Sequence, residues 1–509
     1  MASIERSAGP TINPPAPKPG LDFGRLHRWH MQAGLWVALA VMLWALSGLG
    51  HPIISRINPR PAAMTPPLGA LQDGAAAAIA PRDALQGAGL DAFESLVLWQ
   101  PAGEAPSYRV EAQGRAYWID ARSGSVQADG ERRWAERLAR HFAGDTQSPI
   151  RDVTLLLSFN NDYHYIDRLL PVWQVTFDRP DGLRAYVDPA SGRLSTLTDR
   201  RKDWTGKLFR WMHSWSPIQS SPWIQGVMLG LLLTTAGIAA AGLAVYVRLW
   251  RRAALGVARP AAVRWHRRLA LPAAVVALAL PLSGALHLAV KSWQGDPTAP
   301  APPLSFTATE LRASLPDVLR ALAAGGPVAA LTLTRLEGRP VWIALPPVAL
   351  ATSAHHGGPE NPPPPVDRYV DAVSGVEIAD GASRHAAALA RRHAGLPPDA
   401  QAHAEAVHRF GGDYGFAFKR LPVMAVEFPE RPSETWFVET RTGALAAHLT
   451  PLNRFEDWVF GVVHKWSFLD PAVGKGGRET LQSLAALALV LTVALGLSRH
   501  LSRRRPRSG

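Results

Sequence analysis

Two long apolar segments with the same pattern constrain this chain more than any other feature. The first reads WHMQAGLWVALAVMLWALSGLGH from Trp29 to His51, and the second reads WHRRLALPAAVVALALPLSGALH from Trp265 to His287. In both, the second residue is a histidine and another histidine follows 21 positions later. At a rise of about 1.5 Å per residue, a helix of that length covers roughly 31 Å, which is close to the thickness of a bilayer's hydrocarbon core. Each segment therefore predicts a membrane-spanning helix with one imidazole at each membrane face.

Hydropathy along the chain predicts a helical membrane protein with large parts outside the bilayer. Four transmembrane helices are expected, at 27–53, 223–247, 268–290 and 479–498. Arginines are concentrated in the loop 248–267 and in the tail 499–509, so the positive-inside rule places both in the cytoplasm. The Pro-rich leader 1–26 is too polar to form a core and is expected to be a disordered cytoplasmic segment. Both termini are then cytoplasmic, and the long loops 54–222 and 291–478 lie on the outer side.

The composition excludes several kinds of chemistry. The chain has no cysteine, which excludes thiolate metal sites, iron–sulfur clusters, disulfides and thioether-linked haem. The formal net charge of +13 comes largely from arginines that flank apolar segments, so we assign it to membrane orientation and expect no nucleic-acid partner. No HExxH, Walker or glycine-rich dinucleotide motif occurs.

The outer loops contain a repeated hairpin motif. Four segments share an aromatic or aliphatic residue, an acid three residues before Ser or Thr, and then Gly. Their acids are Asp120, Asp188, Asp371 and Glu439. Each predicts a strand entering a turn, where the acid accepts backbone N–H groups and glycine supplies a positive φ. Helix-like stretches at 132–142 and 383–394 separate the motifs within each loop. We therefore expect α+β domains in both loops, and a tandem duplication whose matching residues face each other across a pseudo-twofold axis.

Three pairs of histidines recur at matching positions of the two halves: His30 and His266, His51 and His287, and His213 and His464. Ionisable residues at membrane depth are costly and are usually functional. Neutral imidazole is a good axial ligand of haem iron, so the pairs predict two or more non-covalent b haems. His30 and His266 are expected to share one haem at the cytoplasmic face. The four remaining histidines could serve one haem or two, and the membrane-embedded His51 and His287 are our first choice. The alternative is that these histidines only anchor helix ends.

The order of these motifs resembles the PepSY-associated transmembrane family of bacterial inner-membrane proteins. The resemblance extends over about residues 25–500. It is carried by the sequence LHRWH ending at His30, the Ser-Gly pairs at 47–48 and 283–284, the motifs around His213 and His464, and the four hairpins. It implies periplasmic PepSY-like domains, haem on the repeated histidines, and reduction of a ferric siderophore or other ferric chelate at the periplasmic face. Two features depart from the family pattern: His27 is an alternative ligand to His30, and a Pro-rich insert occupies 350–367.

These expectations describe an oxidoreductase that passes electrons across the membrane and releases Fe(II). Siderophore oxygens are hard donors that suit Fe(III), so reduction weakens iron binding. The cytoplasmic segments are too short for a flavin or dinucleotide domain, so the donor would be a cytoplasmic reductant or membrane quinol. Two alternatives remain: a non-enzymatic, membrane-anchored binding or regulatory protein with PepSY-type domains, and a quinol oxidoreductase of cytochrome b type.

Overall fold

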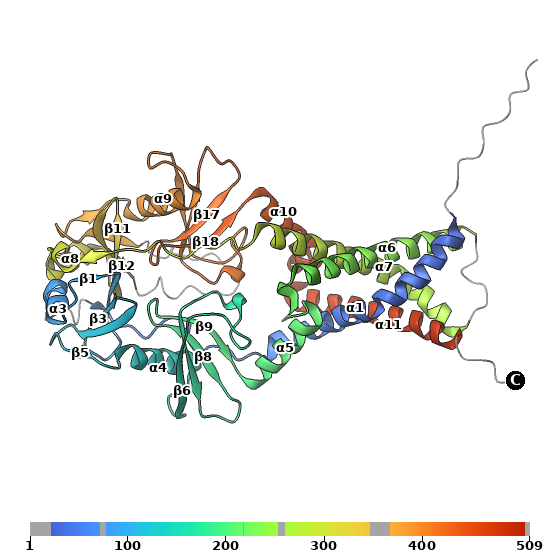
Figure 1. Cartoon of the computed structure of the whole chain (residues 1–509), viewed down its shortest axis with the longest axis horizontal. Helices are drawn as coiled ribbons and strands as arrows, with labels where there is room; N and C mark the ends of the chain where they lie inside the picture. The colour runs from blue at the N-terminus through green and yellow to red at the C-terminus, as the bar shows by residue number, and fades with distance from the viewer. Residues whose placement is uncertain (1–21, 72–77, 217, 253–259, 347–366, 504–509) are drawn as a thin grey trace, which may run out of the picture. The chain divides into compact units, whose positions relative to one another are not determined.

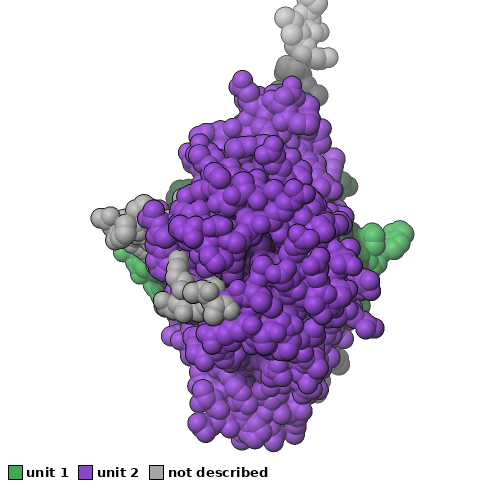
Figure 2. Space-filling view, turned by 90° about the vertical axis from the view of Figure 1, so that its left-hand side faces the viewer, with its two compact units in different colours: residues 1–51, 211–288, 459–509 green, residues 52–210, 289–458 purple. Residues whose placement is uncertain are grey.

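The computed structural model describes residues 22–71, 78–216, 218–252, 260–346 and 367–503, with side chains to residue 498. Most of the predicted leader, the end of the tail and nearly all of the insert at 350–367 lie outside these residues. The chain divides into two compact units, coloured green and purple in Figure 2. The first, which we call the bundle unit, comprises residues 1–51, 211–288 and 459–509, and the second, the sheet unit, comprises 52–210 and 289–458.

The bundle unit is built on four long helices that run side by side in Figure 1. They are α1 (Phe23–Ile57), α6 (Pro222–Arg251), α7 (Ala261–Gln294) and α11 (Asp470–Arg503). All four include a stretch long and apolar enough to cross a membrane, which confirms the four predicted helices and indicates a membrane protein. Each helix extends beyond its predicted span because polar residues continue the helix past the apolar stretch.

Small and β-branched residues form the contacts between these helices. Val37 and Val41 of α1 pack with Ala239 of α6, Ala273 of α7 and Leu489 of α11. In lipid, helices gain little from burying apolar surface against each other, so close packing through small residues holds such a bundle together. These small side chains also leave room for a cavity between the helices.

The sheet unit joins the two long loops in one eight-stranded antiparallel sheet. The order is β14-β13-β12-β11-β2-β3-β4-β5. The first loop provides β2 (Ser95–Trp99), β3 (Ser107–Ala112), β4 (Arg115–Asp120) and β5 (Val126–Gln127). The second provides β11 (Ala330–Leu336), β12 (Arg339–Leu345), β13 (Arg368–Asp371) and β14 (Glu377–Ile378).

The two halves of this sheet meet where β2 pairs with β11, with Leu98 opposite Leu331. Strands β1 (Ala92–Phe93) and β10 (Phe306–Thr307) make a second connection between the loops. Four of the five β2 residues and five of the seven β11 residues are buried. Apolar strands of this kind need a neighbour on both sides and favour the centre of a sheet. The loops predicted as two domains, at 54–222 and 291–478, therefore share one sheet.

Each loop also forms a helix packed on a four-stranded antiparallel sheet (Figure 1). The first set is α4 (Gly130–Ala143) with β6 (Ile150–Leu156), β7 (Val172–Phe177), β8 (Arg184–Asp188) and β9 (Arg193–Thr198). The second is α9 (Gly381–Ala394) with β15 (His403–Val407), β16 (Val423–Glu427), β17 (Thr435–Glu439) and β18 (Ala444–Leu449). Both helices were expected from the sequence, as was the α+β character of the loops.

Three of the four hairpin motifs form as predicted, and the fourth differs at its acid. Strands β4, β8, β13 and β17 each end at the motif acid. Asp120, Asp188 and Asp371 accept hydrogen bonds from the backbone N–H groups of the next residues in the turn. The motif glycines have φ between 68° and 76°, a region that other residues rarely adopt. Glu439 differs, since its carboxylate is fully buried and bonds to arginines.

Candidate functional site

His30 and His266, the first predicted pair, face each other in the bundle unit. Their ring centroids are 6.4 Å apart and the ring planes meet at 63°. A metal–imidazole bond is about 2 Å long and each ring centre lies about 1 Å beyond its nitrogen, so two imidazoles sharing one metal have centroids roughly 6 Å apart. The observed spacing therefore fits one metal atom between the two rings.

Backbone carbonyls of neighbouring helices fix the orientation of both rings. The Nδ1 of His30 is 3.1 Å from the carbonyl oxygen of Ile238 on α6. The Nδ1 of His266 is 3.0 Å from the carbonyl oxygen of Thr492 on α11. A ring that donates its Nδ1 proton to a carbonyl presents an unprotonated Nε2, which is the tautomer required of a metal ligand. The same arrangement in both halves of the chain prepares both rings for coordination.

The two rings line a cavity of about 980 Å³ between the helices, at the upper end of the range of small-molecule and cofactor pockets. Small residues follow each histidine along its helix: Gly34 and Ala38 after His30, and Ala270 and Ala274 after His266. Glycines stand opposite the rings on the neighbouring helices, at Gly242 and Gly496. Because none of these residues carries a side chain larger than a methyl group, a largely apolar space, the apolar slot, remains beside the histidines.

Basic residues line the same cavity at the ends of helices α1, α6 and α7. They are His27, Arg248, Arg252 and Arg267. Guanidinium groups bind carboxylates through paired hydrogen bonds. An apolar slot with cations at one end suits a planar apolar molecule that carries carboxylates at one edge. His27 lines this cavity too, but His30 is the residue whose ring faces His266, which favours His30 as the ligand.

His213 and His464 form a second pair with nearly the same geometry. Their ring centroids are 6.5 Å apart and the planes meet at 85°. The Nδ1 of His213 is 2.9 Å from the hydroxyl oxygen of Ser47 on α1, and the Nδ1 of His464 is 3.0 Å from that of Ser283 on α7. Each hydroxyl also donates to a carbonyl of its own helix, Ser47 to Trp44 and Ser283 to Ala279.

A hydrogen bond to the backbone carbonyl of each of these two histidines fixes its main chain. The indole Nε1 of Trp44 donates to the carbonyl of His213 at 3.0 Å, and the amide of Gln482 donates to that of His464 at 3.2 Å. Two residues after each histidine, Trp215 and Trp466 adopt left-handed conformations with φ of 57° and 55°. Such strain in a non-glycine residue persists only where the surroundings impose it, and it is concentrated at functional sites.

The remaining predicted pair, His51 and His287, differs from the other two in its surroundings. His287 stacks on Phe460, with centroids 4.4 Å apart, and Phe460 stacks in turn on His464 at 4.6 Å. His51 lies on α1 with an exposed side chain. We expected His51 and His287 to be the first choice for the outer pair, but the geometry favours His213 and His464. The reason is that the segments before α6 and α11 bring their histidines against Ser47 and Ser283, which a count along α1 and α7 could not show.

The two ring pairs lie at well-separated levels of the bundle. His30 and Ser47 are 17 residues apart on α1, as are His266 and Ser283 on α7. That separation corresponds to about 25 Å along a helix, comparable to a bilayer core of roughly 30 Å. The bundle therefore has one histidine pair towards each end of its apolar region.

A porphyrin fits these residues better than a bare ion. Among the described residues, no cluster of three or more His, Asp or Glu side chains is placed to hold a metal ion. Each ring pair offers two axial imidazoles, which is what a six-coordinate haem takes from its protein. Around the first pair, the apolar slot suits the porphyrin face, and His27 and Arg267 suit its two propionates. The residues around the first pair therefore fit one haem, and the second pair offers the two axial imidazoles that another would need.

Several residues of these sites were missed by sequence reasoning. Gly242 and Gly496, the carbonyls of Ile238 and Thr492, and the amide of Gln482 leave no recognisable signal. Ser47 and Ser283 did leave one, because they recur at the same 236-residue offset as His30 and His266. In comparisons with known proteins, neither a family model nor a curated protein matches this chain.

Proposed function

We propose that this chain is a membrane haem protein that moves electrons across the bilayer to a ferric chelate outside it. The proposal rests mainly on the two histidine pairs, which have centroid distances of 6.4 and 6.5 Å and repeat between the halves of the chain. Two interfacial histidines could meet by chance in a bundle. Two pairs with the same spacing, each with Nδ1 engaged, are hard to explain without a shared ligand.

The chain's own residues would bind and orient the cofactor. His30 and His266 would hold one haem b, and His213 and His464 another, each through Nε2. Ile238 and Thr492 carbonyls and the Ser47 and Ser283 hydroxyls would hold the ring tautomers. Haem, when bound, supplies a one-electron couple between Fe(III) and Fe(II), whose potential depends on the axial ligands and their hydrogen bonds.

The direction across the membrane follows from charge. Arginines at the end of α6 and the start of α7 support a cytoplasmic position for this end of the bundle under the positive-inside rule, and the family resemblance supports a bacterial inner membrane. The first histidine pair then faces the cytoplasm, and the sheet unit lies in the periplasm. The ferric chelate as acceptor follows from the family resemblance described above. Release of Fe(II) follows from the preference of hard oxygen donors for Fe(III).

A visible spectrum of the purified full-length protein tests the proposal most directly. We expect a sharp Soret band and resolved α and β bands after dithionite reduction, with about two haems per chain. His30→Ala and His213→Ala should each lose about half of the haem, because each removes one ligand of one site. His403→Ala is the matched control: this exposed histidine of β15 should keep the full haem content.

A colourless, folded preparation would overturn the proposal and favour a non-enzymatic binding protein. The acceptor is tested separately by mixing the reduced protein with a ferric siderophore or with a quinone. Reoxidation by the ferric chelate alone supports our proposal. Reoxidation by quinone alone would assign the protein to the quinol oxidoreductases.

A further inference from the structure

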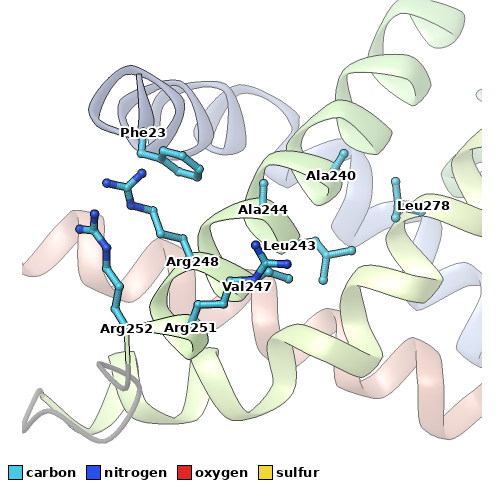
Figure 3. A pocket seen from close by; sticks show the side chains of 9 residues that line it. All are labelled: Phe23, Ala240, Leu243, Ala244, Val247, Arg248, Arg251, Arg252 and Leu278. Carbon is cyan, nitrogen blue, oxygen red and sulfur yellow. The ribbon is translucent and has the colours of Figure 1, made fainter. Parts of the chain in front are cut away.

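A second cavity, of about 640 Å³, lies at one end of the bundle unit. Figure 3 shows its lining. One part is apolar, with Ala240 and Ala244 one turn apart on α6 and Leu278 on α7, and the other part is formed by Arg248, Arg251 and Arg252 at the end of α6. We call this cavity the arginine trough. It follows the surface of α6 for 12 residues, or about 18 Å.

The three arginines carry positive charge that the described residues leave uncompensated. The guanidinium of Arg248 lies over the ring of Phe23, 3.9 Å from its centroid. Within the described ranges, no carboxylate forms an ion pair with Arg248, Arg251 or Arg252. Three guanidinium groups offer fifteen N–H donors in total, and their planar forks match phosphate oxygens. In Figure 3 the guanidinium groups of Arg248 and Arg252 lie together near Phe23, and that of Arg251 lies apart from them, towards Leu243 and Val247. The trough can therefore contact a phosphate at the first two arginines and another part of an anionic headgroup at Arg251.

The apolar part of the trough indicates which class of phosphate compound can bind there. Alanines at Ala240 and Ala244 leave a groove along α6, and Leu278 forms part of its wall. A free phosphate or nucleotide would have no use for this surface, whereas an acyl chain would fill it. Basic pockets between helices at the cytoplasmic side of a membrane are where anionic headgroups bind. We propose that an anionic phospholipid occupies the arginine trough, with its headgroup between the three arginines and an acyl chain along the two alanines.

A quinone is the other lipid-soluble molecule to consider. Oxidation of a quinol requires a group that accepts its protons, and the titratable side chains that line the trough are all arginines. Arginine remains protonated in proteins and cannot serve as that base. The chemistry of the lining thus favours a permanent anion over a quinol.

The trough is distinct from the haem cavity, although Phe23, Arg248 and Arg252 line both. Arg251 and Ala244 line the trough alone, so they separate lipid binding from haem binding. Arg251→Gln removes one donor to the headgroup, and Ala244→Leu fills the acyl groove without changing the charge. Arg503→Gln, at the end of α11, removes the same charge elsewhere and serves as the matched control.

The test uses the full chain in detergent, with native mass spectrometry after addition of phosphatidylglycerol, phosphatidylethanolamine or a long-chain quinone. We expect the wild type to retain one phosphatidylglycerol in preference to phosphatidylethanolamine. Both trough variants should lower that occupancy about fivefold or more, and Arg503→Gln should not. An unchanged melting temperature shows that the variants are folded. Equal retention of both phospholipids, or wild-type binding by both trough variants, would refute the proposal. Loss of quinone alone in those variants would assign the trough to a quinone.

Discussion

Ser47 and His213 are joined by a hydrogen bond of 2.9 Å between the Ser47 hydroxyl and the histidine Nδ1, and the same bond recurs between Ser283 and His464 at 3.0 Å. The partners in each pair are 166 and 181 residues apart in sequence. A hydroxyl can accept from Nδ1–H while donating to a carbonyl of its own helix, so each serine fixes one tautomer of its histidine. These bonds make the second histidine pair as well ordered as the first.

Replacing Ser47 by alanine should weaken haem binding at the second pair only. Loss of a hydrogen bond to a metal-bound histidine typically costs about 10- to 100-fold in affinity. We expect Ser47→Ala to lose haem when it is diluted or mixed with a haem-free protein that competes for haem. Ser283→Ala should behave in the same way. Thr234→Ala is the control, because the Thr234 hydroxyl only donates to the carbonyl of Gly230 within α6. Equal haem retention by all three variants contradicts the assigned role of the serines.

Gly242→Ala should disturb the first histidine pair, whereas Gly496→Ala should not. A methyl group at Gly242 would lie 2.9 Å from Cε1 of His30, while one at Gly496 would lie 3.8 Å from Cε1 of His266. The first distance is a clash that forces the ring to move, and the second is an ordinary contact. We expect Gly242→Ala to lose about half of the haem per chain, as removal of one ligand would.

Gly230→Ala supplies the control for this pair of variants. It lies on the same helix α6, and no atom outside its own helix is within 4 Å of the added methyl group. Replacing glycine by alanine inside a helix usually stabilises it by about 1 kcal/mol, so haem loss in Gly242→Ala alone can be assigned to the ring. Identical haem content in the Gly242 and Gly230 variants would be evidence against a ligand at His30.

Glu439→Gln should destabilise the sheet unit. The carboxylate of Glu439 is fully buried and forms salt bridges with Arg193 of the first loop and Arg420 of the second. Burial alone would raise the pKa of Glu439, but the two guanidinium groups outweigh it and hold that pKa at about 2. Removing the charge takes away the carboxylate that forms salt bridges with both arginines, and breaking a buried pair typically costs about 3–5 kcal/mol.

Thermal unfolding in detergent measures this effect. The control is Glu434→Gln, because the Glu434 carboxylate pairs with the partly buried His448 of β18. The control should lower stability by about 1 kcal/mol or less, as exposed pairs usually do. If the Glu439 variant has the same melting temperature as the control, the salt bridges of Glu439 with Arg193 and Arg420 do not stabilise the contact between the two loops.

His385 should make the sheet unit less stable in mild acid. Its side chain is 2% exposed in α9, and its Nδ1 lies 3.0 Å from the hydroxyl of Tyr369. Burial lowers the pKa of His385 from 6.5 to about 4. Below pH 6.5 the unfolded chain binds a proton that the folded chain does not, so stability present above that pH is lost as the pH falls towards 4.

Because of His385 alone, the free energy of unfolding should fall by about 2 kcal/mol between pH 7.5 and pH 5. Chemical unfolding at these two pH values should show a smaller difference for His385→Gln than for the wild type, because glutamine does not titrate. His403→Gln, at an exposed position of β15, should retain the wild-type difference. A His385 variant with an unchanged pH dependence would rule out this histidine as the acid-sensitive group.

Local patterns in the sequence predicted the long helices, the helices α4 and α9, and three of the turns. Membrane-spanning helices follow from the length and hydropathy of α1, α6, α7 and α11, and helices α4 and α9 lie where helix-like stretches separated the motifs. The turns after Asp120, Asp188 and Asp371 follow from the need for a backbone N–H acceptor and a glycine. The shared sheet could not be predicted in this way, because the pairing of β2 with β11 joins strands more than 230 residues apart.

The sequence by itself determined that matching histidines recur in two sister halves, and the helical rise between them predicts levels about a bilayer's thickness apart. The tertiary structure decided which of them meet. His213 and His464 face each other because two short segments turn at Trp215 and Trp466 and place their histidines against Ser47 and Ser283. Spacing along a helix measures depth in the membrane, but contact between rings depends on the packing of segments that are distant in the chain.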